Sequence, residues 1–386
     1  MHFDTRLVRA GQDAEPGTGD VVPPIHIATT YERRVQPEPT YFYARGENPT
    51  REGLESCLAA LEDAPHAAVF SSGQAAAATV LSLLAPGRTV VAMDDLYSGT
   101  DALLEMAVQR GVRVRYAPLH DAAAATDALD EPDLAMVWVE TPSNPLLRIV
   151  DIAALAGPAH DRGALLVVDN TFASPALQQP LALGADVSLY STTKFVAGHG
   201  DVLGGALVYR DGELDHAIRA YRTAAGNVPG ALDCYLVHRG VKTLALRMAR
   251  QVRTAGLLAR LLTGLPGVGD VYYPGLPGHA GQKVAARQMS APGALLSFEY
   301  TDGPAEQLLD RFRLFSCAVS LGGVQSLVEC PALMTHRPLP PKVRRARGIS
   351  DGLIRISAGI EDPDDLAQDL AQAVRGSAPA SAQRRT

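Results

Sequence analysis

Two segments of the sequence place a charged side chain directly after a predicted buried strand. Asp169 follows the apolar run Leu165–Val168, and Lys194 follows the run Val187–Tyr190 after three hydroxyl residues. In open α/β sheets ligands bind beyond the carboxyl ends of the strands, so we expect both side chains at one site. A carboxylate can keep a pyridine nitrogen protonated, and a lysine amine can form an imine with an aldehyde. A surface position would be the default for Lys194 alone, but together with Asp169 it predicts a site for pyridoxal 5′-phosphate (PLP).

Hydroxyl groups and a glycine-containing turn could bind the phosphate of such a cofactor. Ser191 and Thr193 lie beside the lysine and offer hydroxyl donors. In the segment Ser71–Ala75, Gly73 permits close backbone approach, and the helix that begins there directs free N–H groups toward an anion. The alternative for this turn is a plain helix N-cap by Ser72.

Two further side chains follow or lie in predicted strands. Tyr97 comes after the run Thr89–Ala92 and could stack on a cofactor ring, or it could be an ordinary loop tyrosine. Arg355 lies in the predicted strand Leu353–Ser357, and its guanidinium could bind a substrate carboxylate with two hydrogen bonds. The alternative for Arg355 is a charge on the face of a strand. The fold decides between these possibilities.

Between residues 50 and 240, short apolar runs alternate with helical patterns. The expected strands are Thr89–Ala92, Val112–Tyr116, Ala135–Val139, Leu165–Val168 and Val187–Tyr190. The expected helices are Glu52–Glu62, Gln74–Leu84, Thr100–Arg110 and Asp151–His160. Continuous hydrophobicity indicates strands that are buried on both faces. The pattern therefore predicts an α/β domain with a mostly parallel central sheet and helices on both faces.

The character of the sequence changes to α+β after a long helical pattern at Val241–Leu262. The expected elements there are strands Ala294–Tyr300 and Leu353–Ser357 and helices Ala305–Phe312 and Asp364–Val374. Arg337–Arg347 is rich in proline and basic residues and is expected to be a surface loop, and the polar tail after Arg375 is expected to be disordered. We divide the chain into an N-terminal arm (1–50), a large domain (51–244) and a small C-terminal domain (245–386).

The arm differs from the rest of the chain. It is rich in glycine and proline, and the stretch Thr40–Arg45 carries three aromatic residues. Such a segment is either disordered or folded onto another subunit, and a flexible terminus is the simpler alternative. The clustered aromatics favour docking onto a neighbouring subunit.

Bulk properties exclude several classes of protein. The 35 basic and 42 acidic residues give a net charge of −7, which disfavours nucleic acid as a partner. No apolar run approaches the roughly 20 residues of a membrane span. The start Met1–Leu7 is polar and the four cysteines form no C-x-x-C pair, so we expect a cytoplasmic protein with free thiols. Histidines and cysteines show no metal-binding spacing, and Gly198–Gly204 has one residue too many for the G-x-G-x-x-G loop of a dinucleotide-binding oxidoreductase.

Nine motifs in this chain follow the order of one enzyme family. They are Tyr43-Ala44-Arg45 with Asn48-Pro49-Thr50, Ser72-Gly73, Asp95-Leu96-Tyr97, Glu140-Thr141-Pro142 with Asn144-Pro145, Val168-Asp169-Asn170-Thr171, Ser191-Thr192-Thr193-Lys194, Gly198-His199-Gly200-Asp201, Ser320-Leu321-Gly322-Gly323 and Met334-Thr335-His336. Together they resemble the Cys/Met-metabolism family of PLP-dependent enzymes, fold type I. The resemblance covers nearly the whole chain and is much more specific than any single motif.

The resemblance implies roles for individual residues. It implies cofactor contacts from Tyr43, Arg45, Gly73, Gln74, Tyr97, Asn144, Asp169, Thr171, Ser191, Thr193 and Lys194. It implies substrate contacts from Phe42, Val319, Ser320, Leu321 and Arg355. As catalytic residues, Lys194 would hold the cofactor and move protons, Asp169 would pair with the pyridine nitrogen, and Tyr97 would stack on the ring and help to move protons. Tyr43 and Arg45 would reach the phosphate in a neighbouring subunit, which makes the smallest active species a dimer and implies a homotetramer of two catalytic dimers.

Four positions bear on the choice of substrate. Cystathionine enzymes commonly carry acidic residues before the arm tyrosine and before the Ser-Leu-Gly-Gly motif, where this chain has Phe42 and Val319. An apolar residue leaves the distal ammonium of cystathionine without a partner, which resembles methionine γ-lyase. The tyrosine loop has Gly99 instead of the cysteine common in methionine γ-lyases. Ala102 stands where cystathionine enzymes often have an arginine, so the two departures point in opposite directions.

The expected reaction is γ-elimination from L-methionine or a related thioether, which releases an α-keto acid, ammonia and a thiol. The alternatives are a cystathionine γ-lyase, or γ-replacement as in cystathionine γ-synthase and the homoserine-ester sulfhydrylases. A noncatalytic member of the family is disfavoured by the presence of Lys194, because loss of the imine is the simplest way to lose activity.

Overall fold

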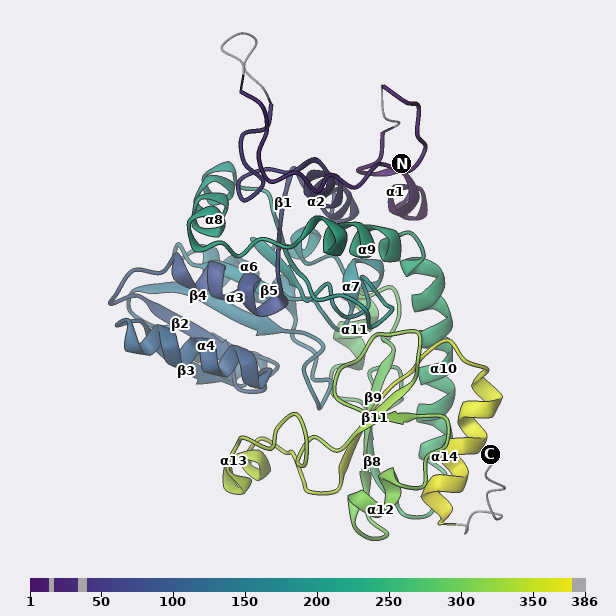
Figure 1. Ribbon diagram of the computed structural model, residues 1–386. Coiled ribbons are helices and arrows are strands. Elements are labelled where there is room, and N and C mark those ends of the chain that lie inside the picture. The colour runs from purple at the N-terminus through teal and green to yellow at the C-terminus, as the bar shows by residue number, and fades with distance from the viewer. Residues whose placement is uncertain (14–16, 34–39, 377–386) are drawn as a thin grey trace.

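The computed structural model describes residues 1–13, 17–33 and 40–376. It contains two β-sheets, each with its own apolar core, and these are joined along a long helix (Figure 1). The tail that the sequence analysis expected to be disordered lies, from residue 377 onward, outside the described residues.

The larger sheet has seven strands. In chain order they are β1 (His66–Phe70), β2 (Thr89–Met93), β3 (Arg113–Ala117), β4 (Leu134–Glu140), β5 (Leu165–Asp169), β6 (Val187–Tyr190) and β7 (Gly205–Tyr209). Their order across the sheet is β1-β7-β6-β5-β4-β2-β3. Only β7 runs antiparallel to its neighbours. The prediction of a mostly parallel central sheet is therefore confirmed.

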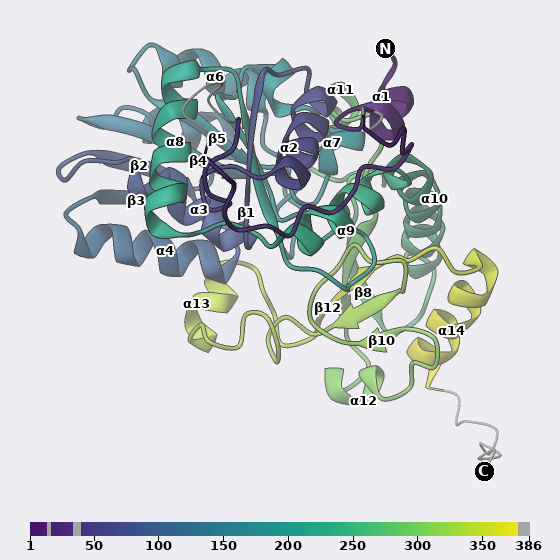
Figure 2. The same cartoon turned by 45° about the horizontal axis from the view of Figure 1, so that its top comes forward.

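Helices cover both faces of this sheet (Figure 1). They are α1 (Phe3–Arg9), α2 (Pro49–Leu61), α3 (Gly73–Ser82), α4 (Ser98–Gln109), α5 (Ala122–Ala128), α6 (Ile152–His160), α7 (Ser174–Leu177), the 3₁₀ turn η1 (Pro180–Leu183), α8 (Gly212–Ala225) and α9 (Ala231–Val241). Strands β2, β6 and β7 are buried along their whole length, as continuous hydrophobicity predicts for strands covered on both faces. Both α2 and α8 pack on β1 (Figure 2).

Two strands of the large sheet were not predicted, and a third differs from its prediction. The strand β1 contains two alanines and β7 begins with Gly-Ala, and these residues favour strands only weakly. The strand β3 was expected to be buried, but it lies at the edge of the sheet and most of it is exposed or half-buried. At the two edges of the sheet, β1 and β3, the position of the strand therefore decides strand formation and burial more than its composition does.

The smaller sheet has five mostly antiparallel strands. The elements of this region are α10 (Leu244–Leu262), β8 (Val268–Tyr272), α11 (Gln282–Gln288), β9 (Leu295–Tyr300), α12 (Ala305–Leu309), β10 (Ser316–Cys317), β11 (Leu327–Glu329), α13 (Pro341–Ala346), β12 (Leu353–Ser357) and α14 (Pro363–Arg375). The strand order is β10-β11-β12-β9-β8. Helices α10 and α14 lie side by side against this sheet (Figures 1 and 2). Ala285 and Met289 of the α11 region pack instead into the core of the large sheet.

The segment Arg337–Arg347 is not only a surface loop, as predicted, because it contains the helix α13. Pro341 occupies the first helical turn, where a missing N–H costs nothing. Arg344 is buried and pairs with Asp351 at 3.2 Å. The prolines that suggested a loop therefore start a helix.

The beginning of the arm docks on its own chain. Helix α1 buries Leu7 against the large domain, and Arg6 Nη1 donates a hydrogen bond to the carbonyl of Ala60 at 2.8 Å. The first part of the arm is therefore neither disordered nor folded onto another subunit, and the contact of Thr40–Arg45 with a neighbouring subunit stays a prediction. A seven-residue amphipathic turn was too short to show helical periodicity in the sequence.

Helix length and composition also bear on membranes. Every helix in residues 1–13, 17–33 and 40–376 is too short or too polar to cross a bilayer. The longest, α10, has 19 residues and includes four arginines. The four cysteines are free thiols, of which only Cys317 is exposed.

Candidate active site

A cavity of about 290 Å³ lies between the carboxyl ends of the large-sheet strands and the small domain. The predicted site residues that line it are Gly73, Gln74, Tyr97, Asn144, Asp169, Thr171, Ser191, Thr193, Lys194, Val319, Ser320, Leu321 and Arg355. The structure thus brings together side chains that lie up to 282 residues apart in the sequence. Phe42, Tyr43 and Arg45 are predicted site residues that do not line this cavity in their own chain.

Lys194 lines the cavity from the loop that follows β6. Its Nζ donates a hydrogen bond to Ser320 Oγ at 2.7 Å. Burial lowers the pKa of Lys194 to about 8, and the positive charge of Arg355 adds to this effect. A lysine with a lowered pKa has more of the neutral amine, which is the form that attacks a carbonyl carbon.

Two buried carboxylates form the acidic end of the cavity. Asp169 ends β5 and Glu140 ends β4, and the two are paired in the sheet register. Burial raises the pKa of Asp169 to about 6, although the N–H of Thr171 donates to its Oδ1 at 2.9 Å. Burial and the charge of Asp169 raise the pKa of Glu140. Within the described part of the chain neither carboxylate forms an ion pair, so this end is suited to a cation such as a protonated ring nitrogen.

Glu140 also fixes the loop that carries Tyr97. Its carboxylate accepts hydrogen bonds from the Tyr97 N–H and the Thr100 hydroxyl, both at 2.8 Å. Tyr97 precedes the first turn of α4, and its side chain faces the cavity. Glu140 lies in one of the family motifs, but the sequence alone indicates no role for it. Its position at the end of the predicted strand Ala135–Val139 is the same signal that identified Asp169.

The N-terminus of α3 forms the polar floor of the cavity. Ser72 caps the helix, since its Oγ accepts the Ala75 N–H at 3.1 Å, so the N-cap interpretation is correct. Gly73 and Gln74 at the first turn also line the cavity. A Cβ atom at Gly73 would lie 2.9 Å from the Cβ of Ser191, so only glycine allows this close approach. Free helical N–H groups beside hydroxyls make a site for an anion such as a phosphate.

Arg355 forms the basic end of the cavity from β12. Its guanidinium donates to Asn144 Oδ1 at 2.8 Å and to the Ser320 carbonyl at 2.7 Å. It also pairs with Glu329 of the neighbouring strand β11 at 2.9 Å, and Thr335 donates to the same carboxylate at 3.0 Å. The Nε of Arg355 is buried without a hydrogen-bond partner among the described residues. The sequence analysis gave no role to Glu329 or Thr335, and only the Met-Thr-His motif hinted at the second.

The backbone at Ser320 is strained, and this strain places its side chain. Ser320 has φ of +90° and Gly322 has φ of +80°. A Cβ atom at Gly322 would lie 2.6 Å from the N atom of Phe195, so the loop runs directly against the Lys194 backbone. Such strain in a non-glycine residue is found mainly at functional sites. Here it holds Ser320 between Lys194 and Arg355.

The aromatic part of the arm lies outside the cavity. Phe42 is 65% and Tyr43 is 40% exposed. Arg45 donates to the carbonyl of Thr223 at 2.7 Å, and its guanidinium lies 5.6 Å from the centre of the Tyr43 ring. These three residues cannot serve the cavity of their own chain from this position.

The cavity is complementary to PLP together with an amino acid. Its acidic end fits a ring nitrogen, its helix N-terminus fits a phosphate, its lysine fits an aldehyde, and its arginine fits a carboxylate. No group of three or more acidic, histidine or cysteine side chains that could hold a metal ion occurs among residues 1–13, 17–33 and 40–376.

Comparison with known proteins agrees with this geometry. The sequence model of the family described as Cys/Met metabolism PLP-dependent enzymes matches residues 4–375 of this chain. A cystathionine γ-synthase from Mycobacterium bovis is 46% identical over 376 residues, which cover 96% of each chain.

Two solved structures of CalE6 from Micromonospora echinospora are each 66% identical to this chain. One covers 98% of this chain and 100% of its own with a TM-score of 0.96, and it is called a cystathionine γ-lyase. The other, an apo form, covers 97% and 99% with a TM-score of 0.93, and it is called a methionine γ-lyase. The names given to this relative thus include both of the activities between which the sequence is divided.

Proposed function

We propose, on the premise that this chain belongs to the Cys/Met metabolism family of PLP-dependent enzymes, that it is a carbon–sulfur lyase acting on L-methionine or a related thioether. The reaction is γ-elimination, in which substrate and water give an α-keto acid, ammonia and a thiol. The observation that carries the proposal is the cavity in which Lys194, Asp169, Tyr97 and Arg355 meet.

The cofactor would be held at three points of the cavity. Lys194 provides the amine for the aldehyde carbon, and the Asp169 carboxylate, oriented by Thr171, provides the negative charge for the ring nitrogen. PLP, when bound, supplies an electron sink for negative charge that develops at the substrate Cα. The phosphate donors are the first N–H groups of α3 and nearby hydroxyls, contributed by Gly73, Gln74, Ser191 and Thr193. Tyr97 and Asn144 line the same cavity, where Tyr97 would cover the ring and Asn144 would lie near the ring hydroxyl.

Arg355 would bind the substrate carboxylate. It is held by Asn144 and Glu329, so its guanidinium keeps one orientation before substrate arrives. Ser320 lies next to it and can donate its hydroxyl to the same carboxylate. This arrangement directs the substrate Cα toward Lys194, whose Nζ lies 2.7 Å from Ser320 Oγ.

Two side chains would move the protons. As the free amine, Lys194 would accept the Cα proton, because a neutral amine at a lowered pKa is a suitable base, and it would have to release that proton before it could accept one from Cβ. Tyr97 donates the proton that the departing sulfur requires. Both side chains line the cavity from the same large domain.

The preference for a neutral thioether rests on Val319, which precedes Ser320 and lines the cavity. Its side chain offers the far end of the substrate no charge, and Leu321 adds a second apolar contact. Phe42 is the corresponding apolar residue of the arm. A distal ammonium, as in cystathionine, would find no carboxylate at these positions.

A kinetic screen tests this preference. The pure enzyme is incubated with methionine, cystathionine, homocysteine, cysteine and acylated homoserines, and keto acid and thiol are assayed. We expect turnover of methionine above that of cystathionine. The specific alternative is cystathionine γ-lyase, favoured by the name of one CalE6 structure. Silence with both substrates, and product from a homoserine ester plus a thiol, would establish a γ-synthase or sulfhydrylase instead, as the mycobacterial relative is named.

We further propose that the active species is a cytoplasmic homotetramer of two catalytic dimers without nucleic-acid or membrane partners. Tyr43 and Arg45 are exposed in the isolated chain and absent from its own cavity. They would complete the phosphate site of a neighbouring subunit. An active monomer in sedimentation experiments would contradict this assignment.

A further inference from the structure

The peptide units around Arg45 are held by one side chain of α2. Arg51 donates from Nη1 to the carbonyl of Ala44 at 2.8 Å and from Nη2 to the carbonyl of Gly46. These two carbonyls flank Arg45 in the chain. A planar guanidinium that binds two carbonyls fixes the peptides between them more tightly than a single donor could. The segment that carries Arg45 therefore has a defined path.

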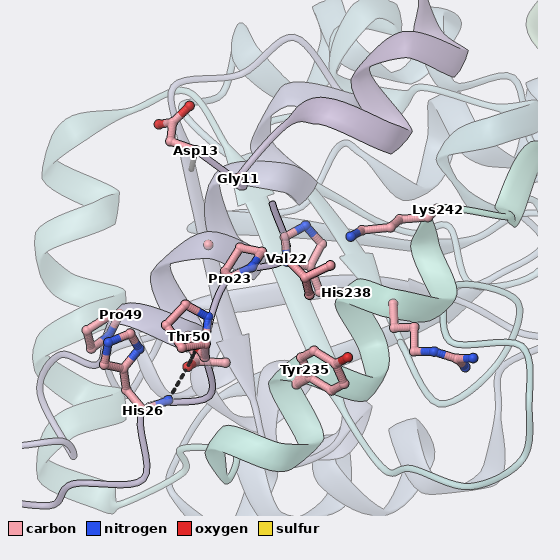
Figure 3. A pocket seen from close by; sticks show the side chains of 13 residues that line it. Gly11, Asp13, Val22, Pro23, His26, Pro49, Thr50, Tyr235, His238 and Lys242 are labelled. Atoms are coloured by element: carbon pink, nitrogen blue, oxygen red, sulfur yellow. Dashed lines mark hydrogen bonds between the residues drawn. The ribbon is translucent and has the colours of Figure 1, made fainter. Parts of the chain in front are cut away.

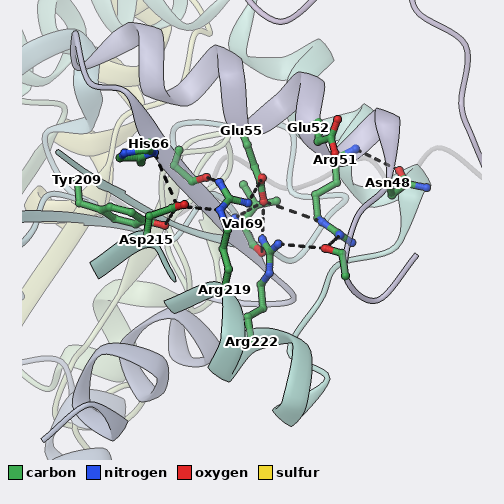
Figure 4. Close-up of polar contacts among 12 residues, drawn as sticks. Asn48, Arg51, Glu52, Glu55, His66, Val69, Tyr209, Asp215, Arg219 and Arg222 are labelled. Carbon is green, nitrogen blue, oxygen red and sulfur yellow. Dashed lines mark hydrogen bonds and ion pairs between the residues drawn. The ribbon is translucent and has the colours of Figure 1, made fainter. Parts of the chain in front are cut away.

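Arg51 belongs to a buried charge cluster (Figure 4). Its Nε lies 3.9 Å from Oε1 of Glu55, one turn later in α2. Arg222 and Arg219 of α8 pair with the same carboxylate, Arg219 at 2.8 Å. Burial opposes the charge of Glu55, but Arg222 and Arg219 still hold its pKa below the usual value. The side chains of Arg51, Glu55 and Arg222 are only 3%, 6% and 1% exposed, so this charge is desolvated at considerable cost.

In direct contact, the three guanidinium groups of the cluster outnumber its carboxylates, and the carbonyls of the arm supply further acceptors. Three guanidinium groups meet two carboxylates, since Asp215 also pairs with Arg219 at 2.7 Å. Among the described residues Arg51 pairs only with Glu55, which Arg219 and Arg222 approach more closely, and it turns its two terminal nitrogens to the arm carbonyls. Arg222 reaches the Gly46 carbonyl as well, at 3.5 Å. The carbonyl groups of the arm backbone therefore accept the hydrogen bonds that Arg51 and Arg222 do not make to carboxylates.

The earlier segment of the arm, around His26, is bound to the same N-terminal end of α2. The N–H of His26 donates to Thr50 Oγ1 at 2.9 Å, as Figure 3 shows beside a cavity of about 400 Å³ under the arm. Asn48 donates to the His26 carbonyl at 2.8 Å, and the N–H of Ala44 donates to the Thr29 carbonyl at 2.9 Å. Both segments of the arm are thus fixed at the N-terminal end of α2.

We propose that Arg51 is a positioning residue that presents Tyr43 and Arg45 to the phosphate of the cofactor in a neighbouring subunit. The proposal rests on the function proposed above, in which these two residues complete the neighbour's site. The backbone is clamped to α2 while the Tyr43 side chain stays 40% exposed, which is what service to a second subunit requires.

Arg51→Lys tests the clamp, because lysine keeps the charge but cannot bind both carbonyls. Arg51→Gln is made in parallel, since it brings no charge into the cluster and leaves the test standing if one variant fails to fold. The control is Arg311→Lys, which removes a guanidinium that binds Tyr300 Oη and the Ala373 carbonyl in the small domain. We expect PLP affinity of the apoenzyme to fall about tenfold in the Arg51 variants, on the scale of one charge-assisted hydrogen bond, and to stay unchanged in the control.

Hybrid oligomers distinguish a role in the neighbouring site from a role in the same chain. Arg51→Lys subunits are co-expressed with Lys194→Ala subunits, and hybrids are isolated through two different tags. Only the Arg51→Lys subunit can form the yellow lysine-linked cofactor, and in the hybrid its arm donor has a wild-type clamp. We expect the PLP affinity measured by this absorbance to return to the wild-type value.

An Arg45→Ala and Lys194→Ala hybrid is measured beside it. If this second hybrid recovers and the Arg51→Lys hybrid does not, Arg51 acts within its own chain and the clamp is refuted. If neither hybrid recovers, Arg45 does not serve the neighbouring site, and both the arm assignment and the clamp fail. Unchanged PLP affinity in folded Arg51→Lys or Arg51→Gln enzyme would also overturn the proposal.

Discussion

The two ends of the active-site cavity differ in charge and in the way the chain builds them. At the acidic end Asp169 and Glu140 are carboxylates whose pKa values are raised by burial. At the basic end Lys194 and Arg355 are cations whose pKa values are lowered by burial. The acidic end comes from two neighbouring strands of one sheet, whereas the basic end needs the small domain.

The difference separates two tasks. Both carboxylates of the acidic end belong to the large sheet, so the position of the charge that would face the ring nitrogen depends on the packing of the large domain alone. The basic end depends on the packing of β12 and the Ser320 loop against the large domain. Substitutions at the acidic end should therefore lower the rate of the chemical steps, and substitutions of Arg355 at the basic end should mainly weaken substrate binding.

The largest effect is expected for Asp169→Asn. Loss of the charge that keeps the ring nitrogen protonated should lower kcat by about a hundredfold to a thousandfold, the scale of one electrostatic contact to developing charge. The control is Asp95→Asn, a buried carboxylate with a pKa raised to about 6 that binds Ser143 outside the cavity. Steady-state kinetics that show equal losses in the two variants would contradict the role of Asp169.

The next effect is expected for Arg355→Lys. A lysine cannot bind a carboxylate with two parallel hydrogen bonds, so KM should rise by about tenfold to a hundredfold while kcat changes less. Arg344→Lys, which alters a buried arginine paired with Asp351, is the matched control. A fall in kcat at constant KM would show that Arg355 belongs functionally to the acidic end.

A smaller effect is expected for Glu140→Gln. The amide would present a donor to either the Tyr97 N–H or the Thr100 hydroxyl and release the tyrosine loop. We expect a loss of about tenfold in kcat, the scale of one hydrogen bond to a charged group, with little change in substrate KM. The same kinetics on Thr100→Val, which removes only one of the two contacts, should give an intermediate value. A wild-type kcat in Glu140→Gln would show that this carboxylate is not needed to hold the Tyr97 loop.

The last prediction concerns pH and needs no substitution. The pKa of Lys194 is lowered to about 8, so the neutral amine of the apoprotein becomes dominant above that pH. The initial rate of PLP capture, followed by absorbance, should rise about tenfold per pH unit up to about 8 and then level off. A rate that continues to rise toward pH 10 would indicate an exposed, unperturbed lysine.

Much of the site could be predicted from the sequence because its residues end buried strands. Asp169 and Lys194 follow continuous apolar runs, and such runs locate the ligand edge of a parallel sheet. Glu140 gives the same signal and was missed only because no chemistry required a second carboxylate. The alanine-rich strand β1 was missed because its residues favour helices as much as strands.

Other features could not be predicted, because they depend on contacts across the fold. Glu329 reaches Arg355 only through the pairing of β11 and β12, which no local pattern indicates. The strain at Ser320 has no sequence signal in a serine. The prolines before α13 suggested a loop, but Pro341 begins a helix there that buries Arg344.

The most direct test of the central claim is to identify the lysine that holds the cofactor. The holoenzyme is reduced with borohydride, digested, and mapped by mass spectrometry. The chain has only four lysines, at positions 194, 242, 283 and 342, so the assignment is unambiguous. We predict a single modified peptide that contains Lys194, and no modified peptide from the Lys194→Ala variant. A label on Lys242, Lys283 or Lys342, or no label on a protein saturated with PLP, would contradict the account.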